Sequence, residues 1–237
     1  MSNQSNKPVC VIVGVGPGNG AAFARRFGSE GYRVALLARS TEFTMALAQE
    51  IDGARAYACD VADAASIEAA FAAIRAELGE VDTLIYNAGA GVWKNVEEIT
   101  PEDFEQSWRV NALGSLLVSK QVMAAMKQNK RGNIIFIGAT ASRRGGAKTA
   151  AFAPAKAAQK SLAESMARHL GPCGVHVALV IVDGIVDTPA TRKMKPEAPE
   201  DAFIRPADLA EVVIGLAQQH PSTWSSEIEI RPFREVW

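Results

Sequence analysis

Cysteine and histidine are scarce in this sequence, and their placement argues against two kinds of site. The cysteines, Cys10, Cys59 and Cys173, are odd in number and far apart, so neither a disulfide framework nor a cysteine metal site is predicted. The three histidines are scattered, with no cysteine or carboxylate at ligand spacing. We therefore predict no metal centre.

Long apolar runs and an excess of one charge are missing too. No run approaches the roughly 18 apolar residues that span a bilayer, and residues 1–10 lack the apolar core of a signal peptide. Lys and Arg number 25 against 26 Asp and Glu, so no net field would recruit nucleic acid or an anionic membrane. We expect a cytoplasmic protein whose partner is a small molecule, with no nucleic-acid or membrane partner.

The sequence does contain a regular alternation of short apolar runs and longer amphipathic stretches. This alternation predicts an α/β fold with a doubly wound, mostly parallel, Rossmann-like sheet of about seven strands and helices on both faces. No linker interrupts the pattern, so a single domain over 1–237 is expected. The predicted strands are 9–15, 33–38, 54–61, 82–89, 132–138, 175–184 and 226–232, and the predicted helices are 20–31, 41–51, 63–78, 100–128, 149–170 and 206–219.

The least patterned segment is 185–204, which is rich in proline and charge. It follows a predicted strand on the side where such sheets bind ligands. Long loops are uncommon and often functional. A substrate flap over a pocket and a plain solvated loop are two equally good interpretations.

Glycines cluster between the first predicted strand and the first predicted helix, at Gly14, Gly16, Gly18 and Gly20. Glycine permits positive φ and lets backbone N–H groups approach a ligand closely. The helix that follows offers unpaired N–H groups and a partial positive charge to a pyrophosphate. A glycine cluster in this strand-to-helix context predicts dinucleotide binding.

The end of the second predicted strand indicates which dinucleotide is bound. An acidic residue there favours NAD, whereas an arginine pairs with the 2′-phosphate of NADP. The sequence has no carboxylate at this point and places Arg39 at the tip. Because a guanidinium suits a phosphate, we favour NADP(H) over NAD(H) as the cofactor.

Further short motifs follow in a characteristic order along residues 8–230. They are the spacing of Gly14, Gly18 and Gly20; Asp60-Val61; Asn87-Ala88-Gly89; Asn111; Phe152 to Lys156; and Asp183-Gly184 with Thr188. In this order the motifs resemble those of the short-chain dehydrogenase/reductase family. Together with the glycine loop, the resemblance implies nucleotide contacts at Gly14, Gly16, Gly18, Asn19, Gly20, Arg39, Asp60, Val61, Asn87, Ala88, Gly89, Lys156, Gly184 and Thr188.

The catalytic positions depart from the family pattern. The resemblance implies a tyrosine that exchanges a proton, a lysine that lowers the pKa of this tyrosine and binds the nicotinamide ribose, and a serine that holds the substrate oxygen. Here Phe152 stands at the tyrosine position and Ala139 is the closest match to the serine. Lys156 and Asn111, which in the family holds a water beside the lysine, are retained. The sequence thus predicts a cofactor site that has lost its usual proton carrier.

Another group would have to carry the proton. Thr140 is the first candidate, one residue from the serine position, and Asp183 is the second; Ser142 and Tyr86 are weaker alternatives. The predicted catalytic set is therefore Asn111, Lys156, Thr140 and Phe152. Candidate pocket walls are Trp93, Phe152, Ile185 and Met194.

These features favour an NADP(H)-binding oxidoreductase that acts on an alcohol, carbonyl or enone with a non-standard proton donor. The missing phenol leaves two alternatives open: a catalytically impaired cofactor-binding sensor or structural subunit, and a non-redox lyase or epimerase on the same scaffold. The alanine-rich faces of 100–128 and 149–170 would let helices approach closely. In the resembled family such helices pair between subunits, so a homodimer or homotetramer is expected.

Overall fold

The computed structural model describes residues 7–235, so the ends of the predicted domain, 1 and 237, lie outside the described residues. Its centre is a seven-stranded sheet in the order β3-β2-β1-β4-β5-β6-β9, with every neighbouring pair parallel. This arrangement confirms the predicted doubly wound, Rossmann-like fold. The strands are β1 Val9–Val13, β2 Arg33–Ala38, β3 Arg55–Ala58, β4 Thr83–Tyr86, β5 Asn133–Ala139, β6 His176–Val182 and β9 Glu227–Ile230.

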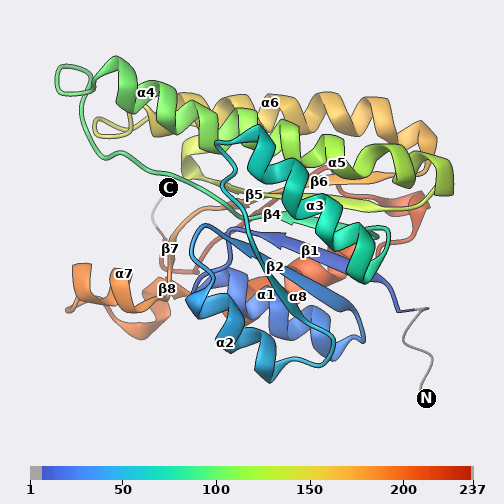
Figure 1. The fold of residues 1–237 in the computed structure, drawn as a ribbon. Coiled ribbons are helices and arrows are strands. Elements are labelled where there is room, and N and C mark those ends of the chain that lie inside the picture. The colour runs from blue at the N-terminus through green and yellow to red at the C-terminus, as the bar shows by residue number, and fades with distance from the viewer. Residues whose placement is uncertain (1–6, 236–237) are drawn as a thin grey trace.

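Helices cover both faces of the sheet (Figure 1). The helices on one face are α1 Asn19–Ser29, α2 Glu42–Glu50 and α8 Pro206–Ala217, and those on the other are α3 Ala64–Leu78, α4 Pro101–Trp108, α5 Gly114–Asn129 and α6 Phe152–Leu170. Alternate residues of β1 point into the two cores: Val11 and Val13 into one, Cys10 and Ile12 into the other. A strand buried on both faces explains why 9–15 reads as a continuous apolar run.

The predicted helix 100–128 is interrupted at its middle. It begins with a capping box in which Thr100 Oγ1 accepts from the Asp103 backbone N–H at 3.2 Å. Between α4 and α5 lies a five-residue π-helical turn, Arg109–Leu113. Such turns are frequent at functional sites, and this one carries Asn111.

The 185–204 segment has secondary structure of its own. It contains β7 Ile185–Val186, α7 Pro189–Met194, a 3₁₀ turn Glu200–Ala202 and β8 Phe203–Ile204. β7 and β8 pair in parallel and close the segment at its base. In Figure 1 it projects from one end of the sheet. Its role as a flap remains a prediction.

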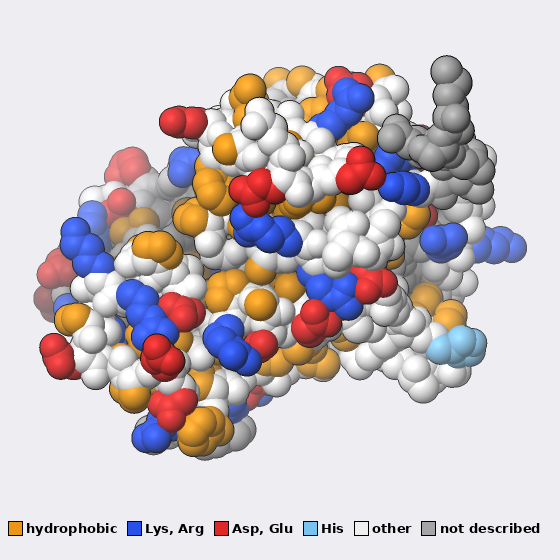
Figure 2. All heavy atoms as spheres, turned by 90° about the horizontal axis from the view of Figure 1, so that it is seen from below, with side chains coloured by type: hydrophobic (Ala, Val, Ile, Leu, Met, Phe, Trp, Pro, Cys, Tyr) orange, Lys and Arg blue, Asp and Glu red, His pale blue; other side chains and the backbone are white. Residues whose placement is uncertain are grey.

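Charged side chains of both signs are interspersed on the face that carries α1, α2 and α8, which Figure 2 shows from below. Arg25 pairs with Glu50 at 2.7 Å, and Arg26 pairs with Glu211 at 2.6 Å, so charges on this face link its helices to one another. Within residues 7–235, no helix combines the length and the apolar character needed to cross a membrane.

Candidate active site

The loops that follow β1 and β4 touch each other at the carboxyl end of the sheet. Gly14 has φ +85°, and a Cβ on it would lie 2.5 Å from Ala88 Cα, so only glycine fits there. The Asn87 side-chain amide donates to the Gly14 carbonyl at 2.7 Å. The Asn-Ala-Gly motif therefore fixes the position of the glycine loop.

The start of α1 has the features of a phosphate site. No side chain caps this helix, and its first turn holds no acidic residue, so its first N–H groups and its partial positive charge face no competing anion there. The Asn19 Oδ1 atom is buried and has no hydrogen-bond partner among the described residues. A Cβ at Gly18 would lie 2.8 Å from Thr188 Cγ2, so the 185–204 segment lies directly against this loop. The uncapped helix start fits the pyrophosphate end of a dinucleotide, whereas the Asn19 oxygen would accept from a donor group of a ligand.

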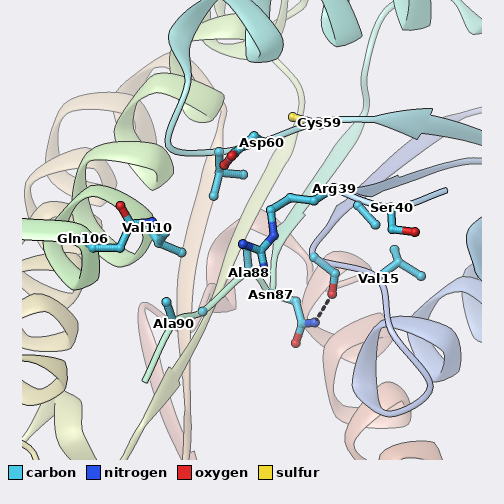
Figure 3. Close-up of a pocket in the computed structure, with 14 residues that line it drawn as sticks. Val15, Arg39, Ser40, Cys59, Asp60, Asn87, Ala88, Ala90, Gln106 and Val110 are labelled. Atoms are coloured by element: carbon cyan, nitrogen blue, oxygen red, sulfur yellow. Dashed lines mark hydrogen bonds between the residues drawn. The ribbon is translucent and has the colours of Figure 1, made fainter. Parts of the chain in front are cut away.

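One cavity, of about 420 Å³, lies beside the glycine loop and is shown in Figure 3. We call it the first cavity. The Arg39 side chain reaches into it from the end of β2 toward Ala88 (Figure 3). Asp60 lies across the cavity, where one carboxylate oxygen accepts from the Ala62 N–H at 2.9 Å. Of the predicted nucleotide contacts, this cavity brings together Gly14, Arg39, Asp60, Val61, Asn87, Ala88 and Gly89.

A second cavity, of about 620 Å³, shares Asn87 and Gly89 with the first. The two cavities are therefore adjacent, and one extended ligand could occupy both. Of the predicted site residues, the second cavity brings together Asn19, Asn87, Gly89, Thr140, Phe152, Lys156 and Gly184. Gly16, Gly18, Gly20, Asn111 and Thr188 line neither cavity, although Asn111 lies directly behind Gly89.

Phe152, the first residue of α6, faces the second cavity. Its ring centroid lies 5.6 Å from that of Trp93, so the two rings form one aromatic wall. The predictions for Ile185 and Met194 are wrong, since neither lines this cavity and Val186 does. Successive strand residues point to opposite sides, which turns Ile185 away when Val186 faces in, and Met194 lies at the end of α7 with 77% of its surface exposed.

Two hydrogen bonds hold the buried Lys156 ammonium in place. Lys156 is only 4% exposed, and its ammonium donates to the Ile137 carbonyl at 2.9 Å and to Gln159 Oε1 at 3.0 Å. The Gln159 amide in turn donates to the Asn111 carbonyl at 3.0 Å. Burial lowers the pKa of Lys156 to about 8. Sequence reasoning missed Gln159, although a residue three positions after the lysine shares its helix face.

The side chain of Asn111 points toward the same place as Lys156. Its amide donates to the Ala90 and Ser107 carbonyls at 2.9 and 2.8 Å, while its Oδ1 is buried without a hydrogen-bond partner among the described residues. A Cβ on Gly89 would lie 3.4 Å from this oxygen and 3.9 Å from Lys156 Nζ. Glycine at position 89 thus keeps a side chain away from this buried acceptor and buried cation.

The two leading candidates for the proton carrier are bonded to each other. The Thr140 hydroxyl donates to Asp183 Oδ1 at 2.5 Å, although 43 residues separate the two in sequence. Thr140 lines the second cavity, whereas Asp183 is buried behind it. Arg231 and Arg144 lie 3.4 and 3.6 Å from the same carboxylate. A cavity-facing hydroxyl backed by a carboxylate can pass a proton.

The two weaker candidates face elsewhere. The Tyr86 hydroxyl is fully buried and donates to the Val110 carbonyl at 2.5 Å, and burial raises the pKa of its phenol. The Ser142 hydroxyl is buried and accepts from the Ala139 N–H at 3.2 Å. Neither side chain lines the second cavity, so both alternatives are corrected: these hydroxyls serve the protein interior. Ala139 itself contributes only a methyl group to the cavity wall.

Comparison with known proteins agrees with this geometry. The short chain dehydrogenase family profile matches residues 8–199. The 3-oxoacyl-[acyl-carrier-protein] reductase MabA of Mycobacterium tuberculosis is 30% identical over 226 residues, covering 92% of this chain and 88% of MabA. A metagenomic short-chain oxidoreductase in complex with NADP is 32% identical with a TM-score of 0.82, covering 96% of this chain and 98% of the other. A variant of actinorhodin polyketide ketoreductase with NADPH is 25% identical with a TM-score of 0.88, covering 98% of both chains.

This chain belongs to the short-chain dehydrogenase/reductase family, oxidoreductases that typically use NAD(P)(H).

Proposed function

We propose that this protein is an NADP(H)-dependent oxidoreductase that acts on an alcohol, a carbonyl or an enone and that Thr140 and Asp183 carry the proton. The observation that supports this most directly is the 2.5 Å hydrogen bond between the Thr140 hydroxyl and the Asp183 carboxylate at the wall of the second cavity. No phenol occupies the neighbouring position, where Phe152 contributes a ring without a proton to exchange.

The choice of NADP(H) rests on Arg39. Its guanidinium reaches into the first cavity and makes no ion pair there with any described residue, which leaves it available to a phosphate (Figure 3). Ser40, beside it in the same lining, offers a hydroxyl. An acidic residue at this point would repel the 2′-phosphate of NADP, and the chain has none at the end of β2.

In this proposal, one group of residues holds the nucleotide and another transfers the proton. When bound, NADP(H) supplies or accepts the hydride. Lys156 and the glycine loop hold the nucleotide, and Asn87 keeps the glycine loop in place. In alcohol oxidation, the substrate hydroxyl gives its proton to Thr140 Oγ1 as the Thr140 proton passes to Asp183; carbonyl reduction reverses these transfers. For an enone, water would supply the proton in place of the Thr140–Asp183 pair.

Isosteric variants of the pair test this proposal. General acid–base assistance is worth about 10²–10⁴ in rate, so Thr140→Val and Asp183→Asn should each lower kcat at least about tenfold for alcohols and carbonyls, with NADPH affinity retained. Thr149→Val is the matched comparison, because the Thr149 hydroxyl also faces the second cavity but bonds only to the Gly146 backbone. Its loss should be much smaller. Equal rates in all three variants would rule out the Thr140–Asp183 pair.

A cofactor-binding sensor or structural subunit without turnover is the second candidate, and Phe152 is the observation that favours it. The same assay separates the two, because such a protein would bind NADPH by fluorescence yet turn over no member of a carbonyl and enone panel. Phe152→Tyr adds a phenol beside Lys156 and should raise carbonyl reduction only in a working oxidoreductase. Consumption of a substrate with no change in NADPH would instead identify a lyase or epimerase.

A further inference from the structure

The charged groups that line the second cavity are all of one sign. Arg144 and Lys156 both line it, and among the described residues no aspartate or glutamate does. Asp183 is buried behind the cavity, where it contacts two lining residues, Thr140 and Arg144. A cavity lined by two basic side chains attracts a negatively charged group and disfavours a cationic one.

Two neighbouring arginines differ sharply in their partners. Arg143 is fully engaged, because its guanidinium contacts Glu227 at 2.6 Å and Glu229 at 2.5 Å. Arg144 has one ion pair among the described residues, a long one of 3.6 Å to Asp183. That carboxylate already accepts from Thr140 and lies closer to Arg231. The Arg144 side chain is 53% exposed, so its donors remain open to a ligand.

The wall formed by Trp93 and Phe152 indicates the shape of the ligand. Trp93 lines the cavity and is 64% exposed, and its ring lies 5.6 Å from that of Phe152 with the two ring planes tilted by 48°. Gly138 and Ala139 line the cavity with no polar side chain. Flat aromatic faces favour a planar, conjugated group that can stack on them.

We infer that the second cavity binds a planar, unsaturated substrate that carries a carboxylate, and that Arg144 pairs with this carboxylate. A guanidinium presents two parallel N–H donors that match the two oxygens of a carboxylate. This inference names the substrate class of the proposed oxidoreductase and rests on that function for the reaction. The binding step does not depend on turnover.

A pair of probes that differ only in charge tests the inference. trans-Cinnamate is planar, unsaturated and anionic, whereas cinnamamide has nearly the same shape and no charge. In isothermal titration of the protein, alone and loaded with NADP⁺, cinnamate should bind about tenfold tighter, because charge-assisted hydrogen bonds are about twice as strong as neutral ones. Arg144→Gln should remove this preference for the acid, because Arg144 is a basic side chain of the second cavity whose one described ion pair is long.

Arg143→Gln is the matched control and should keep the preference for cinnamate, because Arg143 is occupied by Glu227 and Glu229. Equal affinity for acid and amide, or a preference that survives in Arg144→Gln, would overturn the inference. Cinnamoyl-CoA is a third probe, in which the carboxylate is replaced by a thioester to a phosphate-bearing group. If Arg144→Gln weakens the binding of cinnamoyl-CoA and leaves that of cinnamate unchanged, Arg144 binds a phosphate of CoA and the carboxylate assignment is wrong. The acid-to-amide ratio can be measured even if no substrate is turned over, so failure of the proposed function is a separate result.

Discussion

At the scale of single residues, the site depends on one buried lysine. The Lys156 ammonium is surrounded by acceptors that carry no charge, the Ile137 carbonyl and the Gln159 amide oxygen. Hydrogen bonds of this kind offset only part of the cost of removing a charge from water. The result is a pKa of about 8, below the ordinary lysine value of 10.5.

This difference makes folding stability depend on pH. Between pH 8 and 10.5 the unfolded chain binds more protons at Lys156 than the folded protein does, so the free energy of unfolding rises with pH across that window. The penalty for burying the charge is fully present below pH 8. Relative to Lys156→Met, the unmodified protein should therefore gain stability from pH 7.5 to 10 in urea denaturation without cofactor. Lys120→Met, at an exposed position, should show no such trend; parallel curves for the protein and Lys156→Met would contradict the low pKa.

At the scale of elements, the π-helical turn and α6 are joined by one side chain. Gln159 is fully buried, and it accepts from Lys156 with one end of its amide and donates to the Asn111 carbonyl with the other. Gln159 therefore fixes the distance between Lys156 and the Arg109–Leu113 turn. The Gln159–Asn111 hydrogen bond is the one of the two that joins α6 to this turn, so a large shift of α6 against the turn would break it.

Removing this link should be costly. Gln159→Leu removes one donor to the Asn111 carbonyl and one acceptor from the buried Lys156 ammonium, and an unsatisfied buried group costs about 1–3 kcal/mol. We expect a loss of this size in the free energy of unfolding, together with weaker NADPH binding. Gln128→Leu, at an exposed position of α5, should change neither quantity. A Gln159→Leu variant as stable as the control would show that the link contributes nothing.

The sequence predicts local features of this protein better than it predicts contacts between residues that are far apart in the chain. The alternation of strands and helices and the glycine loop follow from periodicity in nearby residues, and the cavity position of Phe152 follows from the order of the motifs. The Thr140–Asp183 bond was not predictable as a contact, since it requires β5 and β6 to end side by side. Ser142 and Tyr86 could be excluded only after their hydroxyls were seen to bond inside the protein. The orientation of a polar side chain depends on neighbours that one sequence does not reveal.

At the scale of the whole molecule, the outer surface of α4 carries apolar side chains that nothing covers in the single chain. Phe104 and Trp108 are 43% and 42% exposed, and they lie within the segment expected to pair between subunits. Large exposed apolar groups of this kind often mark a protein interface. We propose that this face packs against a second copy.

Light scattering after size exclusion tests this assembly. The protein should elute as a homodimer or homotetramer, and Trp108→Glu should lower its mass, because a charge buried in the contact is not paired. Met45→Glu is the control, since Met45 is also exposed but lies on α2, across the sheet. A monomer at micromolar concentration, or a mass unaffected by Trp108→Glu, would rule out this interface.

The close approach of Gly18 and Thr188 limits which side chain position 18 can carry. Because glycine has no Cβ, the Thr188 methyl group can pack directly against the glycine loop at position 18. A methyl group added at Gly18 would collide with Thr188 Cγ2, so either the Thr188 side chain or the 185–204 segment would have to move away from the glycine loop. The close contact between the glycine loop and the 185–204 segment thus depends on the absence of one Cβ atom.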